Sequence, residues 1–190
     1  MSHYNPFRQD IRTRENTAFI TGPAQLEAGQ MAPALTRLKY IVEELYNGGV
    51  CFFLVGGEPG FDMLAAEYLI RFRDNPPRKK IMVYSVLPCR GWNASWPDCL
   101  QHRQERILRL SDKVVYVSKE FTEDRARRNE IMINSSAHCI SLCNKRNERV
   151  AELVKEALEC GVVIHNASSF DVRQLGRGGI RESVPRYCRT

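Results

Sequence analysis

The chain has 190 residues and a formal net charge of +6, with 43% hydrophobic and 26% charged residues. This length suits one α/β domain with short appendages and is sufficient for a real hydrophobic core. The composition is ordinary for a globular protein, and no apolar run approaches the roughly 20 residues of a membrane-spanning helix, so we expect no membrane association.

Along the chain, apolar runs of strand length alternate with longer segments whose apolar residues have helical spacing. The expected strands cover residues 17–21, 50–55, 80–87, 113–117, 137–143 and 162–165. The expected helices cover residues 33–47, 63–73, 97–110, 123–136 and 147–159. This alternation predicts a Rossmann-like three-layer sandwich of the α/β class, with a mostly parallel sheet of about six strands and helices on both faces.

The positive charge gathers toward the ends of the chain. Residues 1–16 hold three arginines and two acidic residues, and residues 167–190 hold five arginines and two acidic residues. We therefore predict an N-terminal arm over 1–16, the Rossmann-like domain over 17–166 and a basic, mobile tail over 167–190. The polar start has no apolar middle of the kind found in signal peptides, which predicts a cytoplasmic protein.

A glycine-rich turn between the second strand and the second helix is the most informative motif. Gly56-Gly57 ends the apolar run, Pro59-Gly60 follows, and Asp62 precedes residues that favour a helix. Glycines let ligands approach the backbone amides, and the positive end of a helix attracts anions. The turn therefore indicates a phosphate or nucleotide cradle. A plain strand-to-helix turn, with Asp62 as a helix cap, is the simpler alternative.

Other loops that follow strands are expected at the same edge of a parallel sheet, where such folds bind ligands. Arginines at the start of the helix over 123–136 can bind phosphate through two hydrogen bonds, although a solvated helix surface is the alternative. The candidate ligand-binding residues are Thr21, Gly22, Gly56, Gly57, Glu58, Gly60, Asp62, Ser118, Arg128 and Asn129. The four histidines and seven cysteines have no zinc-site spacing, so no metal site is expected.

In these motifs the chain resembles the YspA/YpsA-like family of the SLOG superfamily, which also includes the DNA-processing protein DprA and the LOG nucleotide hydrolases. The resemblance covers about residues 17–165. Its main motifs are Phe-Ile-Thr-Gly at 19–22, Gly-Gly-Glu-Pro-Gly-Phe-Asp at 56–62, Ser-Asp-Lys-Val-Val-Tyr-Val-Ser at 111–118, and Arg128-Asn129. It implies a modified Rossmann-like fold with a pocket for a nucleotide or nucleotide-derived ligand similar to ADP-ribose or NAD.

We therefore predict binding or sensing of such a ligand, without evident catalysis and with no certain cofactor. One alternative is a LOG-like N-glycosidase acting on nucleoside monophosphates, for which Arg103 and Glu130 are the catalytic candidates. The loop that begins at Ser118 lacks the glycines of the LOG catalytic loop, which argues against that activity.

A second alternative is DprA-like binding of single-stranded DNA through basic residues. The domain over 17–166 carries a net charge of only +2, and its basic residues are not interleaved with aromatic ones, so nucleic acid is the less favoured partner. The apolar helix faces and a loop with Trp92 and Trp96 predict a homo-oligomer; the alternative is that both tryptophans cover the ligand pocket.

Overall fold

The computed structural model describes residues 6–7, 13–27, 29–76, 78, 80–119, 125–144 and 146–175. These residues form a parallel sheet of six strands in the order β4-β3-β2-β1-β5-β6. The strands are β1 (Thr17–Thr21), β2 (Phe52–Val55), β3 (Met82–Leu87), β4 (Lys113–Tyr116), β5 (His138–Ser141) and β6 (Val163–Asn166).

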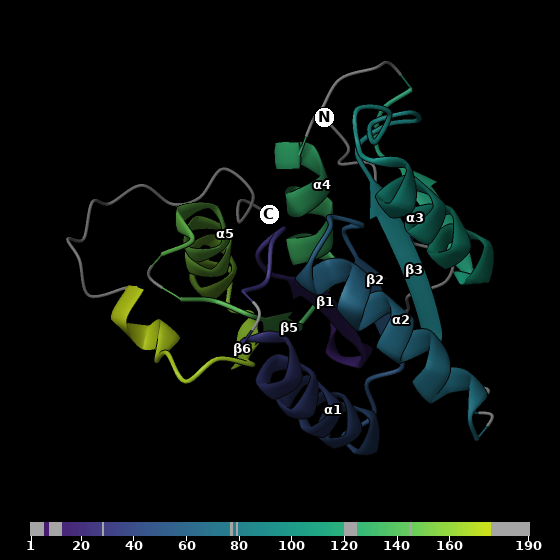
Figure 1. Ribbon diagram of the computed structural model, residues 1–190. Helices are drawn as coiled ribbons and strands as arrows, with labels where there is room; N and C mark the ends of the chain where they lie inside the picture. Colours follow the sequence, from purple (N-terminus) through teal and green to yellow (C-terminus); the bar gives the residue numbers. More distant parts are fainter. Residues whose placement is uncertain are drawn as a thin grey trace, which may run out of the picture.

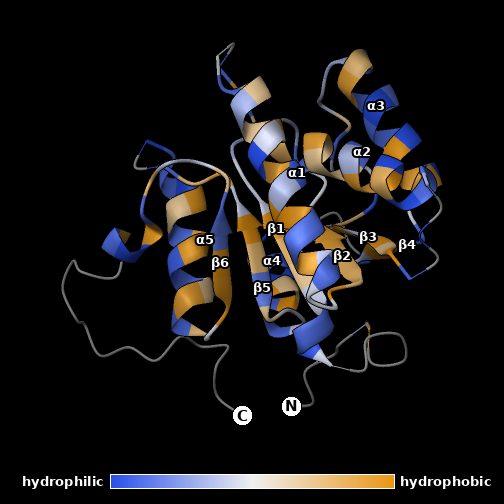
Figure 2. Ribbon diagram, turned by 90° about the horizontal axis from the view of Figure 1, so that it is seen from below, coloured by the Kyte–Doolittle hydropathy of each residue, from blue (hydrophilic) through white to orange (hydrophobic). Residues whose placement is uncertain are grey.

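Five α-helices within the described residues cover the two faces of this sheet (Figure 1). They are α1 (Met31–Asn47), α2 (Phe61–Asp74), α3 (Asp98–Leu110), α4 (Arg125–Asn134) and α5 (Glu148–Glu159). Side chains alternate between the faces of a strand. Accordingly, Ile20 packs in the core with α1, α2 and α3, whereas its neighbour Phe19 packs in the core with α4 and α5. Figure 2 shows the apolar strands between helices whose outer sides are mostly polar.

The predicted Rossmann-like sandwich is confirmed, and each expected strand and helix is present with ends within about two residues. The apolar runs are longer than the strands because some of their residues are buried without pairing in the sheet. Val50, for example, is 2% exposed, but its N–H donates to the carbonyl of Leu45 and closes α1.

The strand order reverses direction at β1. Chain order proceeds from β1 through β2 and β3 to β4 at one edge, and α4 then carries the chain across to β5 on the other side of β1. The loops after β1 and β5 therefore diverge toward opposite faces, which opens a crevice at the carboxyl ends of these strands.

The segment after β6 is partly described. Residues 167–175 include the 3₁₀ helix η2 (Val172–Leu175), and buried Val172 packs with Val150 and Val154 of α5. The rest of the tail, 176–190, and most of the arm over 1–16 lie outside the described residues, so the mobility of the tail remains a prediction. Within the described ranges, no helix combines the length and apolar character needed to cross a membrane.

The predicted oligomer surface is partly buried in the domain itself. Trp92 is only 4% exposed and packs with Leu87 and Cys89, and its ring lies edge-on to that of Trp96 at 4.6 Å between centroids. The tryptophan loop is thus explained by a small core of its own, and homo-oligomerisation remains a prediction.

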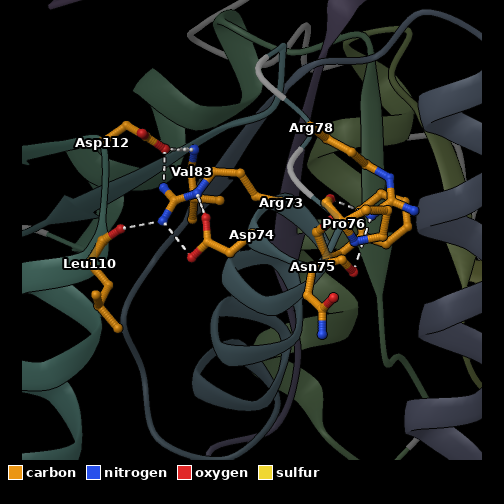
Figure 3. A network of polar contacts seen from close by, with 9 residues as sticks. Arg73, Asp74, Asn75, Pro76, Arg78, Val83, Leu110 and Asp112 are labelled. Atoms are coloured by element: carbon orange, nitrogen blue, oxygen red, sulfur yellow. Dashed lines mark hydrogen bonds and ion pairs between the residues drawn. The ribbon is translucent and has the colours of Figure 1, made fainter.

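At the amino-terminal edge of the sheet, Arg73 ties three elements together (Figure 3). Its guanidinium, at the end of α2, donates to the Asp112 carboxylate at 2.6 Å and to the carbonyl of Leu110, the last residue of α3, at 3.1 Å. The same Asp112 oxygen accepts the N–H of Val83 in β3 at 2.8 Å. Asp74 also accepts from Arg73, but its side chain is 53% exposed.

This geometry predicts unequal losses for two aspartate substitutions beside Arg73. Asp112→Ala removes the carboxylate that accepts from both Arg73 Nη1 and the Val83 N–H, so we expect the free energy of unfolding to fall by about 1–3 kcal/mol. Asp74→Ala removes only an exposed ion pair and should cost less than about 1 kcal/mol. Urea denaturation measures both, and equal losses would contradict the proposed role of Asp112.

Candidate functional site

A pocket of about 120 Å³ lies in the crevice at the carboxyl edge of the sheet. Its walls come from the end of β1, the turn between β2 and α2, helix α4 and the start of α5. Its lining residues are Ile20, Thr21, Gly22, Ala24, Gly56, Glu58, Asp62, Arg128, Asn129, Met132, Asn147, Arg149, Val150 and Leu153.

Seven of the ten predicted ligand-binding residues line this pocket, from three separate parts of the sequence. They are Thr21, Gly22, Gly56, Glu58, Asp62, Arg128 and Asn129. The other three, Gly57, Gly60 and Ser118, are not among its lining residues; the N–H of Ser118 instead bonds to the carbonyl of Pro88 at 2.9 Å.

The two catalytic candidates of the hydrolase alternative also lie apart from the pocket lining. Arg103 of α3 forms a two-bond ion pair with Glu67 of α2, at 2.9 and 2.8 Å. Because that pair bridges two helices on the surface, it explains Arg103 without a ligand. Glu130 lies on α4 but does not line the pocket.

Sequence reasoning missed the contribution of α5. Asn147 and Arg149 line the pocket, and the Asn147 side chain caps α5 by accepting the N–H of Val150 at 3.1 Å. Asn147 follows a strand and precedes a helix, as the glycine turn does. The carboxyl-edge rule, applied to the loop after β5, would have found it.

Opposite charges meet at the pocket around Glu58. Arg128, 5% exposed, donates from Nη1 to the Gly56 carbonyl at 3.1 Å and to Glu58 Oε1 at 3.2 Å. Arg125 Nε also lies 3.2 Å from Glu58 Oε1. The Asn129 side-chain oxygen accepts from the Arg128 guanidinium at 3.1 and 3.3 Å, so this buried cation is held from several sides.

Asp62 is a buried carboxyl group beside this cation. Its pKa is raised to about 8, and burial is the largest cause. The negative charge of Glu58 also raises the pKa, whereas the positive charge of Arg128 and backbone hydrogen bonds from Glu58 and Gly56 lower it. Its Oδ1 atom has no hydrogen-bond partner. The N-cap of α2 is Gly60, with no side-chain cap bond, so Asp62 is not the predicted capping residue. At neutral pH it is a protonated group able to donate a hydrogen bond.

Two glycines of the turn are required for packing within the protein. Gly60 has φ +75°, and a Cβ there would lie 2.3 Å from the Pro23 carbonyl oxygen; Gly57 has the same φ, and its Cβ would lie 2.5 Å from Leu87 Cδ2. The space beside these glycines is thus filled by the chain itself, so they shape the turn from behind the pocket and do not line it.

Comparisons with known proteins place these features in a wider context. The model of the YspA SLOG family matches residues 31–164. Among solved structures, the chain is similar to DNA processing protein A (DprA) from Streptococcus pneumoniae, with a TM-score of 0.57 and 14% identity over 81% of this chain and 50% of that chain. The chain thus spans about half the length of DprA, and the likeness shows the fold alone. The search of curated proteins finds no match.

The contact of Gly60 with Pro23 predicts a strong effect of a single methyl group. Gly60→Ala adds a clash with the backbone to the strain of a positive φ, whereas Gly161→Ala has the same φ of +75° but meets nothing within 4 Å. We expect Gly161→Ala to cost about 1–2 kcal/mol of unfolding free energy and Gly60→Ala about 1–3 kcal/mol more. Similar losses, measured by thermal denaturation, would show that the turn adjusts freely.

The buried carboxyl of Asp62 predicts a pH dependence of stability. The folded protein keeps this proton up to about pH 8, whereas an unfolded chain loses it near pH 4. Since the folded state binds more protons between these values, stability falls as pH rises through this window, by up to about 1.4 kcal/mol per pH unit from this group.

Asp62→Asn removes this contribution. The variant should therefore gain stability relative to wild type from pH 5 to pH 8 and keep a constant difference above that. Urea denaturation at pH 5–9 measures the difference. A difference that does not change with pH would show that Asp62 has an ordinary pKa.

Proposed function

The chain belongs to the YspA SLOG family, and from this premise we propose that it binds or senses a nucleotide or nucleotide-derived ligand, of the ADP-ribose or NAD kind, in the pocket at the carboxyl edge of the sheet. The observation that carries the proposal is a pocket, at the point where the strand order reverses, that is lined by two buried ionisable side chains, Arg128 and Asp62. This is the usual place for nucleotides in doubly wound folds.

The chemistry of the lining suits a phosphate joined to a sugar. Arg128 and Arg149 supply positive charge for phosphate oxygens. A neutral Asp62 does not repel an anion and can donate to a hydroxyl or phosphate oxygen. The side-chain oxygen of Asn129 accepts from Arg128, and its NH2 group can donate to a ribose hydroxyl.

The size of the pocket limits how such a ligand binds. Its volume of about 120 Å³ is below the roughly 300–1,000 Å³ of sites that enclose a drug-sized molecule. The phosphate and ribose are therefore the parts that enter, and the remainder of the ligand extends outside the pocket.

Binding is favoured over N-glycosidic hydrolysis because Arg103 is engaged by Glu67 and neither Arg103 nor Glu130 lines the pocket. The likeness to DprA extends to the fold, and binding of single-stranded DNA gains no support from it.

A cytoplasmic location and a homo-oligomeric state complete the proposal. Light scattering tests the oligomeric state.

The proposal predicts that a ligand shift depends on Arg149. We expect ADP-ribose, NAD or a nucleoside monophosphate to raise the melting temperature of the protein. Arg149→Ala should weaken binding about tenfold, the typical effect of losing a hydrogen bond to a charged group. Because Arg149 is exposed, the variant should keep the wild-type fold.

Arg109→Ala is the matched control, since Arg109 is exposed on α3 and is not a lining residue. Equal weakening by both substitutions would indicate a general charge effect. The absence of any shift with all these compounds would refute the proposal.

A further inference from the structure

We propose that Glu58 occupies the position that the ligand's phosphate takes in the complex, so that in the free protein an internal carboxylate competes with the ligand for Arg125 and Arg128. This inference rests on the proposed function and assigns a specific role within that site. Because an anion has to displace the Glu58 carboxylate in order to bind, Glu58 selects against anions that bind weakly or carry a single charge.

The geometry resembles that of a bound anion. A single oxygen, Glu58 Oε1, lies 3.2 Å from Arg128 Nη1 and 3.2 Å from Arg125 Nε. Arg128 Nη1 donates a hydrogen bond to this oxygen, and Arg125 Nε contacts the same oxygen as an ion pair. The side chains of Glu58 and Arg128 are only 13% and 7% exposed, and both residues line the pocket. Partly buried charges of this kind are costly unless paired, so the position has to hold an anion.

Charge accounting identifies the class of anion that can displace Glu58. Arg125 and Arg128 both form ion pairs with the single Glu58 carboxylate, and the neighbouring Asp62, protonated at neutral pH, adds no negative charge. A phosphate monoester carries about −1.5 to −2 charges and three acceptor oxygens, and the pyrophosphate link of a dinucleotide carries two charges. Either group can satisfy both arginines better than a carboxylate, whereas a singly charged anion cannot.

Displacement of Glu58 requires little change in the backbone. The N–H of Glu58 bonds to the Asp62 side chain, and Gly60 is packed against Pro23. The turn is thus anchored on both sides of Glu58. Rotation of the Glu58 side chain alone can release the arginines, and the pocket then keeps its shape when the phosphate arrives.

The test compares Glu58→Gln with wild type in binding AMP, ADP-ribose and uncharged adenosine by isothermal titration calorimetry. Glu58→Gln keeps the size of the side chain but removes the competing charge. We expect AMP, ADP-ribose or both to bind at least about tenfold more tightly, and adenosine to bind as in wild type. Without ligand the variant should melt at a lower temperature, because the arginines lose their counter-charge. A merely structural Glu58 would lower stability without any gain in affinity.

Two further variants keep the test decisive. Glu105→Gln, at an exposed position on α3 outside the pocket lining, makes the same change in net charge and should leave affinity unchanged. Glu58→Asp keeps the charge but shortens the side chain, which weakens its contact with the arginines, so it should also tighten ligand binding. This variant replaces Glu58→Gln in the test if the glutamine variant does not fold.

Each outcome decides one point. Wild-type binding that is not tightened by either Glu58 variant overturns the role of Glu58 and leaves the proposed function intact. An equal gain in Glu105→Gln also overturns it, as a general charge effect. Failure of wild type and Glu58 variants to bind any phosphate compound overturns both proposals. A gain confined to AMP identifies a terminal phosphate, and a gain confined to ADP-ribose identifies a pyrophosphate.

Discussion

Parallel pairing of β1 with β2 on one side and β5 on the other is the constraint on which the architecture depends. Parallel neighbours need crossover connections, and these crossovers keep one hand. Helices α1, α2 and α3 therefore cover one face, while α4 and α5 cover the other (Figure 1). With both faces covered, the strands are apolar nearly throughout. The reversal at β1 also leaves a crevice between the loops that follow β1 and β5, and this crevice contains the pocket.

The two edges of the sheet have different chemistry. At the amino-terminal edge, Arg73 and Asp112 satisfy backbone groups of α3 and β3, and the arrangement is complete in itself. At the carboxyl-terminal edge, Asp62 retains a buried oxygen without a partner, and Arg128 is buried beside it. Unsatisfied buried polar groups cost stability. The unpartnered Asp62 oxygen belongs to a residue that lines the pocket, which supports the proposal of a ligand that completes its hydrogen bonding.

The charged groups of the site depend on one another. Arg128 is tolerable in a buried position because Glu58 and the Gly56 carbonyl accept from it. Asp62, in turn, remains protonated because burial outweighs the attraction of Arg128. The described charged groups around Glu58 are therefore two arginines, one carboxylate and one neutral acid. In such a site, an incoming phosphate exchanges one anion for another and need not create a new charge in the interior.

Local sequence signals determined the elements, the class of fold and most of the candidate site. The apolar run over 50–55, the glycines after it and the helix formers from Met63 onward interact over short distances, so their structure follows from composition and spacing. Because the carboxyl ends of parallel strands lie at one edge of the sheet, the same signals also predicted that Thr21, Glu58 and Arg128 lie near one another, and all three line the pocket.

The remaining features arose from contacts between distant parts of the chain. The placement of β5 beside β1 brought Asn147 and Arg149 into the pocket lining. Arg103 forms an ion pair with Glu67, which lies 36 positions away in the sequence. The protonation of Asp62 depends on burial beside Arg128, and the role of Gly60 depends on the Pro23 carbonyl. The spacing of residues along the chain does not reveal which residues are buried or which distant residues they contact. Only the tertiary structure therefore decided which candidate residues share a site and which of them are charged.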